Sequence, residues 1–341
     1  AEAPPSDAMA HDQQSPICDQ SGFTKYGQTV YFNANAADGK QLMTTFTQGI
    51  DYTNGVDAAG DTNRWLVSDG IHEYVVEAYD AQNDGVVDSI RVLEPHPLTG
   101  QRGFGFLLTG TIYTLQDNAD FIVSTADDVI VRGNINLLGQ GSDLVLQSDS
   151  WLYWEGQANV NGNITLLGGV EIDGTDRGGA NADGTSVYIN ASSVLNTTRA
   201  GSQITIAGSQ DVELHGAIVA GGTLGATGVT WSGADSSIRI VAGQQVSVDT
   251  GLQAAKSVTL VTTGLTGADD NGWGVVIGSA GGLNAAGITS DQSGGSVAIN
   301  AYGGVTIAGS IVSGGTIRQV FDAQGALQSE TIEWSPEAST I

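Results

Sequence analysis

Apolar residues alternate with small polar residues along much of this chain, and the alternation repeats. Residues 201–222, GSQITIAGSQDVELHGAIVAGG, return without a gap at 294–315 as GGSVAINAYGGVTIAGSIVSGG. Short alternating runs separated by Gly and Ala corners predict β-strands. A unit this small cannot bury a core alone, so neighbouring units must stack and bury one together. The pattern therefore predicts a repetitive β scaffold.

Strand starts recur from about residue 120 at intervals close to 20 residues, which is a solenoid period. They read DDVIV (127), SDLVL (142), GNITL (162), TSVYI (185), SQITI (202), SSIRI (236), KSVTL (256) and GSVAI (295). Second and third short strands follow in the clearest units. This rhythm predicts an all-β, right-handed parallel β-helix of about ten coils over residues 120–315. An antiparallel sandwich also has many short strands, but it does not produce this period or an ungapped self-match.

The alternation also predicts which side chains face the core of each unit. In the first copy of the repeat, Thr205 and Glu213 are expected to point outward. Asn190 and Asn300 hold the same place in their units, so we expect them to join an amide ladder. The inward-facing set is Ile204, Ile206, Val212, Leu214 and Ile218.

Three regions follow from the pattern. Residues 1–22 are polar and read as a tail or linker, residues 23–119 as a non-repetitive β cap or small β domain, and residues 120–341 as the β-helix. Within the second region, Glu73–Tyr79 and Val86–Leu93 are alternating runs joined by a Gly-containing turn, as in a hairpin. Near the C-terminus, Ser329–Trp334 reads as a further alternating strand.

Composition limits the partners. The chain has 341 residues, with 11 Lys and Arg against 37 Asp and Glu, and a net charge of −26. Such a surface repels nucleic acid and anionic lipid, so neither is an expected partner. Cys18 is the one cysteine and has no internal disulfide partner. No apolar run approaches the roughly 20 residues of a membrane span. The chain does not begin with Met, and we expect it to be trimmed or excised from a longer protein.

One segment resembles a calcium-binding loop. Asp80, Asp84 and Asp88 supply oxygen atoms at loop positions 1, 5 and 9, and Gly85 occupies position 6. Position 12, where a bidentate acid belongs, is Arg91. These three aspartates are the candidate metal ligands, with calcium as the candidate cofactor. A plain hairpin turn explains the Asp-Gly pair equally well.

The remaining chemistry points away from catalysis. The four histidines are scattered without zinc-ligand spacing, and His215 reads as a surface variant of the repeat. Arg199 and Arg239 lie in different units and are close enough in the repeat to approach each other. The cluster WLYW (151–154) suits either a sugar platform or a capping or inter-subunit contact. No acid–base constellation stands out, so the chain is expected not to be an enzyme.

The motifs SQITIAGSQDVELHGAIVAGG and SSIRIVAGQQVSVDTGLQA resemble the repeats of filamentous-haemagglutinin-like bacterial adhesins. The resemblance covers residues 127–315, whereas the Asn-Pro-Asn-Gly motif of that family's secretion domain is absent. It implies an extracellular or cell-surface protein with a structural or adhesive role. The expected partners are the chain itself, end to end or within a longer chain, and host or matrix glycans.

The same fold also carries polysaccharide-binding proteins and polysaccharide lyases or hydrolases, which are the alternative. An adhesive rod predicts ladders and smooth faces. An enzyme or binding protein predicts acids and aromatic rings clustered on one face.

Overall fold

The computed structural model describes residues 115–315, apart from 116, 119, 126–127, 171–178, 182 and 265–271. Outside that range it describes the backbone pairing of the strands β1–β9, β33 and β34. Every assigned element is a strand. The described residues include no helix long and apolar enough to cross a membrane.

The chain winds through three parallel sheets, returning to the first sheet after each visit to the third. The first sheet contains β7 (Ser89–Leu93), β10 (Phe121–Thr125), β13 (Leu144–Ser148), β16 (Ile164–Gly168), β19 (Gln203–Gly208), β24 (Ser237–Ala242), β27 (Ser257–Thr262) and β30 (Ser296–Asn300). The second contains β8 (Phe106–Leu108), β11 (Val129–Val131), β14 (Leu152–Trp154), β17 (Thr185–Ile189), β20 (Asp211–Leu214), β25 (Val246–Val248), β28 (Trp273–Ile277) and β31 (Gly304–Ile307). The third contains β9 (Thr111–Thr114), β12 (Asn134–Leu137), β15 (Gln157–Val160), β18 (Val194–Thr197), β21 (Ala217–Ala220), β26 (Gly251–Ala254), β29 (Gly282–Ala285) and β32 (Ser310–Ser313).

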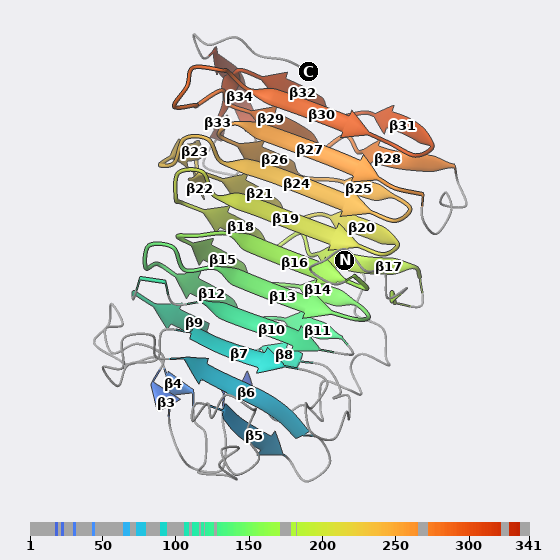
Figure 1. Cartoon of the computed structure of the whole chain (residues 1–341). Coiled ribbons are helices and arrows are strands. Elements are labelled where there is room, and N and C mark those ends of the chain that lie inside the picture. The colour runs from blue at the N-terminus through green and yellow to red at the C-terminus, as the bar shows by residue number, and fades with distance from the viewer. Residues whose placement is uncertain are drawn as a thin grey trace.

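This winding confirms the predicted parallel β-helix. In Figure 1 the strands of the first sheet cross the front from left to right, and the chain returns behind them as it rises, so the winding is right-handed. The predicted range 120–315 holds seven coils, from β10 to β32, rather than about ten, and one further coil made of β7, β8 and β9 precedes them. The expected number was wrong because loops between strands, such as the one joining β16 to β17, lengthen several coils beyond the basic period. The parallel ladder begins at β7, inside the range 23–119.

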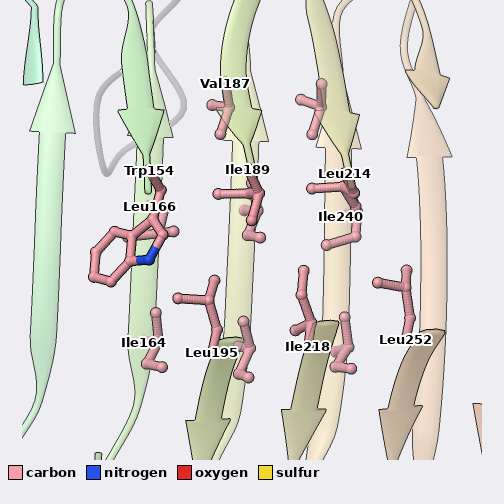
Figure 2. Packing of buried hydrophobic residues seen from close by; sticks show 14 of the residues in the cluster. Trp154, Ile164, Leu166, Val187, Ile189, Leu195, Leu214, Ile218, Ile240 and Leu252 are labelled. Carbon is pink, nitrogen blue, oxygen red and sulfur yellow. The ribbon is translucent and has the colours of Figure 1, made fainter. Parts of the chain in front are cut away.

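A single apolar core runs along the inside of the coils. All five side chains expected to face inward in the first repeat copy have no exposed surface. Figure 2 shows their neighbours stacked in columns, for example Ile189 beside Leu214 from the next coil. Each apolar side chain packs on the side chains at the equivalent position in the coils above and below. The core therefore depends on the register of strand pairing between coils.

The position of each strand among the three sheets was predicted less well. TSVYI (185) and VIV (129) lie in the second sheet, not in the first with the other strand starts. Asn190 therefore follows a strand of the second sheet, whereas Asn300 ends β30 of the first sheet. The predicted amide ladder between them is wrong. Apolar alternation is the same on all three sides, so it does not tell which side a strand occupies.

An amide ladder does exist, on the third sheet. The Asn159 amide donates to Asn136 Oδ1 at 2.9 Å, and the Asn196 amide donates to Asn159 Oδ1 at 3.0 Å. These residues hold the same register position in β12, β15 and β18. Each amide both donates and accepts, so one side chain per coil links three successive coils.

A second ladder of side-chain oxygens marks the corner before the first sheet. Asp120 Oδ1 accepts from the Asp143 backbone N–H at 2.8 Å, and Asp143 Oδ1 accepts from the Asn163 N–H at 2.7 Å. Asn163 Oδ1 accepts from the Gln203 N–H at 2.9 Å. Part of the chain's high acid content thus satisfies backbone donors between coils, where the chain turns and strand pairing stops.

The corner from the second to the third sheet requires glycine at several coils. A Cβ at Gly156 would overlap the carbonyl oxygen of Gly133 in the coil below, and a Cβ at Gly309 would overlap that of Gly281. At these two positions the coils approach too closely for a side chain, whereas Ser193 and Thr250 occupy the same corner in other coils. These glycines explain why small residues recur in each unit.

Additional strands lie outside the coils. β5 (Arg64–Ser68) and β6 (Glu73–Tyr79) extend the first sheet beyond β7, and β6 pairs antiparallel with β7, which confirms the predicted hairpin strands. β22 (Gly222–Gly225), β23 (Gly228–Trp231), β33 (Gly315–Phe321) and β34 (Leu327–Trp334) form a four-stranded outer sheet. Two short pairs, β1 (Cys18–Asp19) with β2 (Gly22–Phe23) and β3 (Val30–Tyr31) with β4 (Met43–Thr44), complete the strands.

The outer sheet lies against the third sheet. β22 contacts β18 and β21, and β33 contacts β29. Val219 and Asn284 point away from the helix core in their strands, yet both are buried. The strand predicted at Ser329–Trp334 is β34, which pairs antiparallel with β33. The chain after β32 therefore leaves the winding path and pairs in the outer sheet.

Replacing Ile206 by Asp tests the core column. The side chain has no exposed surface, so the variant buries an unpaired charge. We expect the free energy of unfolding to fall by more than about 3 kcal/mol, measured by urea unfolding followed by circular dichroism. Thr205→Asp, one position away on the outer face, is the matched control and should cost less than about 1 kcal/mol. Equal losses in both variants would contradict the assigned inward and outward faces.

Candidate functional site

Four rings form a row on the outer face of the second sheet. Trp151 precedes β14, Tyr153 and Tyr188 occupy the same register position in β14 and β17, and His215 follows β20. The Trp151 and Tyr153 ring centroids are 5.3 Å apart, those of Tyr153 and Tyr188 5.5 Å, and those of Tyr188 and His215 5.1 Å. The two tyrosine rings are parallel within 5°. The four rings thus make a continuous stack across three successive coils, here called the ring row.

The ring row is buried at one end and open at the other. Trp151 and Tyr153 are 2% and 3% exposed and pack with Ile130 in a small cluster outside the helix core. Tyr188 and His215 are partly exposed. Because the tyrosine faces cover each other, a ligand can reach only the edges and polar groups of the row.

The WLYW segment divides between two environments. Leu152 and Trp154 point into the helix core, while Trp151 and Tyr153 point outward into the ring row. The Trp154 indole N–H donates to the Gly156 carbonyl at 2.9 Å, whereas no partner within hydrogen-bond distance satisfies the indole N–H of Trp151. All four side chains are buried, so the segment itself does not form an open sugar platform.

The Tyr153 phenol is held in its neutral form. It donates to Glu155 Oε2 at 3.2 Å and accepts from the Asn190 amide at 3.0 Å. Burial, together with the nearby Glu155 carboxylate, raises the pKa of Tyr153 to about 12. Asn190, expected in a ladder, instead anchors this phenol.

His215 lies between two carboxylates from successive coils. Its Nε2 is 3.4 Å from Glu213 Oε2, and its Nδ1 is 3.4 Å from Asp249 Oδ2. The hydrogen bond that the His215 ring donates to the Glu213 carboxylate raises the pKa of His215 and lowers the pKa of Glu213. A protonated ring donates from both nitrogens, so it links the two carboxylates.

Glu213 has little freedom to transfer protons. Its Oε1 accepts from the Thr185 hydroxyl at 2.7 Å, and its Oε2 faces His215. Asp249 is more open, since 45% of its side chain is exposed. The group therefore offers an exposed carboxylate, an imidazole edge and a phenol edge, which suit hydrogen bonding to a hydroxyl-rich ligand.

This grouping was not foreseen. Glu213 was correctly expected to point outward, but neither Asp249 nor Tyr188 was singled out, and the expected faces were smooth. The coil that holds Tyr188 carries a long insert before β17, so the residues of the row follow no constant spacing in the sequence. The WLYW segment was the one visible signal.

The proposed calcium ligands lie outside the described residues. Asp80, Asp84 and Asp88 fall between β6 and β7, which pair antiparallel as the alternative hairpin reading requires. Within the part of the chain that the structure describes, no three His, Cys, Asp or Glu side chains gather closely enough to hold a metal ion.

The basic residues that the structure describes are dispersed. Arg199 lies at an exposed corner before β19, and Arg239 lies exposed in the middle of β24, so they occupy different parts of the coil. Arg132 Nε is 3.9 Å from Glu155, and Lys256 Nζ is 3.5 Å from Asp235. These cations therefore lie at separate places on the surface.

Comparison of the chain with protein-family models, with curated proteins and with solved structures finds no match.

The carboxylate–imidazole group predicts a pH dependence of stability. Because the pKa of His215 is raised, this residue contributes fully to the stability of the fold below its ordinary pKa of 6.5. The contribution is lost as the pH rises through the raised pKa. Because the pKa of Glu213 is lowered, this residue contributes fully to the stability of the fold above its ordinary pKa of 4.5. The contribution is lost as the pH falls through the lowered pKa. The pair therefore stabilises most between pH 4.5 and 6.5.

We expect urea unfolding of the native chain to show a loss of stability as pH rises above 6.5 that His215→Gln lacks. The difference should stay below about 1 kcal/mol, because solvent screens the partly exposed ring. Asp249→Asn, which keeps the Glu213 partner, should retain most of the dependence. Superimposable pH profiles for the native chain and His215→Gln would contradict the assignment.

Proposed function

We propose that this chain is the β-helical shaft of a structural or adhesive extracellular protein. The observation that carries the proposal is the continuity of the coil-to-coil ladders. The apolar columns pass through all coils from β10 upward. On the outside, amide and carboxylate ladders link several of these coils to one another. A stack bonded in this way transmits force along its axis and presents long, flat faces.

The repeat motifs support the extracellular location, because they resemble those of filamentous-haemagglutinin-like adhesins. The net charge of −26 supports partners that are neither nucleic acid nor anionic membrane. The scarcity of Lys and Arg argues against a clustered acid–base site of the kind that lyases use. The shaft carries out no catalysis in this proposal.

The open end of the ring row is the proposed contact with host or matrix glycans. Hydrogen-bond donors and acceptors lie within one partly exposed area, on the side chains of Tyr188, His215 and Asp249. Neutral sugars suit this area best, since the surrounding acidic surface repels uronic acids and sulfated sugars.

A polysaccharide hydrolase or lyase is the second candidate, favoured by the same Glu213, His215 and Asp249 group. A hydrolase needs one carboxyl group to donate a proton and another group to act as base or nucleophile. Both oxygens of Glu213 already accept from Thr185 and His215, and its pKa is lowered, which opposes a role as acid. The geometry therefore favours binding over hydrolysis.

Binding and turnover on one glycan panel test the proposal. We expect the purified chain to bind surfaces coated with neutral glycans without releasing reducing ends. The double variant Tyr188→Ala/Asp249→Ala should weaken binding at least about tenfold, since it removes two of the exposed groups. Thr259→Ala, on the outer face of the first sheet, is the matched control.

Release of reducing ends that Glu213→Gln or His215→Ala abolishes would overturn the proposal in favour of the hydrolase. Binding that is the same for the double variant and the control would remove the ring row as the contact.

A further inference from the structure

The last strand of the second sheet exposes side chains that belong to the core columns. Val305 and Ile307 of β31 lie in register over Val275 and Ile277 of β28. Val275 and Ile277 are 0% exposed, whereas Val305 and Ile307 are 42% and 48% exposed. The same two inward positions in β11, β14, β17, β20 and β25 are all fully buried. The column therefore continues to β31 but lacks a layer above it.

Two aromatic side chains enlarge this exposed apolar area. Trp273 is 42% exposed, and its indole lies where a Cβ on Gly304 would be. Tyr302, just before β31, is 54% exposed and lies against Gly264. Among the described residues, these four make up most of the large hydrophobic side chains that are exposed, the others being Leu115 and Leu138. A concentrated apolar patch of this kind marks an interaction surface.

The patch belongs to one side of the helix end. In the neighbouring end strands the inward-facing side chains are better covered, since Val297 of β30 is 4% exposed and Ile299 of β30 and Ile311 of β32 are partly buried. After β32 the chain pairs with the outer sheet through β33, on the third-sheet side. Figure 1 shows β33 and β34 at the upper left and β31 at the upper right. The chain's own strands thus leave β31 uncovered.

The backbone of β31 is also open to a partner. β31 is the terminal strand of its sheet and has a strand neighbour, β28, on one side alone. The other edge presents N–H and C=O groups at strand spacing, which an extended peptide can pair with. Such a peptide places alternate side chains over Val305 and Ile307.

We propose that the patch, defined as Trp273, Tyr302, Val305 and Ile307 with the free edge of β31, binds one extended strand of a partner polypeptide. The strand has aliphatic residues at alternate positions, because they complete the buried column. It is neutral or basic, because the chain carries a net charge of −26. This inference does not depend on whether the shaft is adhesive, because the glycan contact involves other residues.

A second copy of the chain fits the patch less well. Straight stacking would set the second copy's β8, the terminal strand of the second sheet at the other end, on β31. The first sheet, however, extends two strands beyond β7 through β6 and β5. Those strands would meet β30 before β8 reached β31. The expected end-to-end contact between complete helices is therefore sterically opposed, whereas a single strand meets no such obstacle.

The probe is a fluorescein-labelled peptide, KVTVTVK, titrated with the full chain and followed by fluorescence anisotropy. We expect saturable binding, and hydrogen exchange should slow at the β31 amides on peptide binding. A shuffled peptide, KVVTTVK, and a KVTVTVK peptide N-methylated at alternate residues should bind at least about tenfold more weakly. The shuffled peptide lacks the alternation of Val and Thr, and the N-methylated peptide lacks the backbone N–H donors at the methylated residues.

The variant Val305→Gln/Ile307→Gln should lose binding by at least about tenfold, while Thr306→Gln on the opposite face of β31 should retain it. Both replaced side chains are already exposed, so the variant is expected to fold, and circular dichroism checks this. Absence of peptide binding, or equal binding by both variants, would overturn the proposal. Concentration-dependent self-association that Val305→Gln/Ile307→Gln abolishes would overturn it in favour of a second copy.

Discussion

The structure depends on one repeated interaction, the in-register parallel pairing of each coil with the coil below. Each strand in the middle of the three parallel sheets pairs on both edges with strands of the neighbouring coils, and not with the strands next to it in sequence. Side chains at equivalent positions therefore meet along the axis, whatever their chemistry. Inside, this produces apolar columns such as Val187, Val212 and Val246. Outside, it forces polar side chains to find partners of their own kind or to be exposed to water.

The outer ladders show how this constraint is met. Amides can stack in identical positions because each one donates and accepts, as Asn136, Asn159 and Asn196 do. Carboxylates cannot stack on one another without repulsion, and at the corner before the first sheet they accept from backbone N–H groups instead. The ring row meets the same constraint with aromatic faces. Where the row ends, the carboxylates of Glu213 and Asp249 flank an imidazole, the one side chain there that can carry a positive charge.

The same constraint creates a problem at the ends of the stack. A coil in the middle has both edges paired, but an end coil has one free edge and one uncovered layer of core side chains. This chain covers parts of its ends with antiparallel strands, β5 and β6 at the N-terminal side and the outer sheet along the third sheet. Val305 and Ile307 remain exposed because none of the strands that the structure describes pairs with β31 on the side away from β28. An uncovered column is thus a direct consequence of building a core from identical layers.

The sequence by itself determined the fold class and the inward-facing residues. Alternation places Ile204, Ile206 and Leu214 on the core side whatever the neighbouring coils are, because successive side chains of a strand point to opposite faces. It did not determine the sheet to which TSVYI belongs, since all three sides share that pattern. The number of coils, the partner of Asn190 and the meeting of Tyr188, His215 and Asp249 were decided only by the tertiary structure. These depend on how many residues each loop adds between strands, and a loop's length changes which residues lie above one another without changing the alternation within any strand.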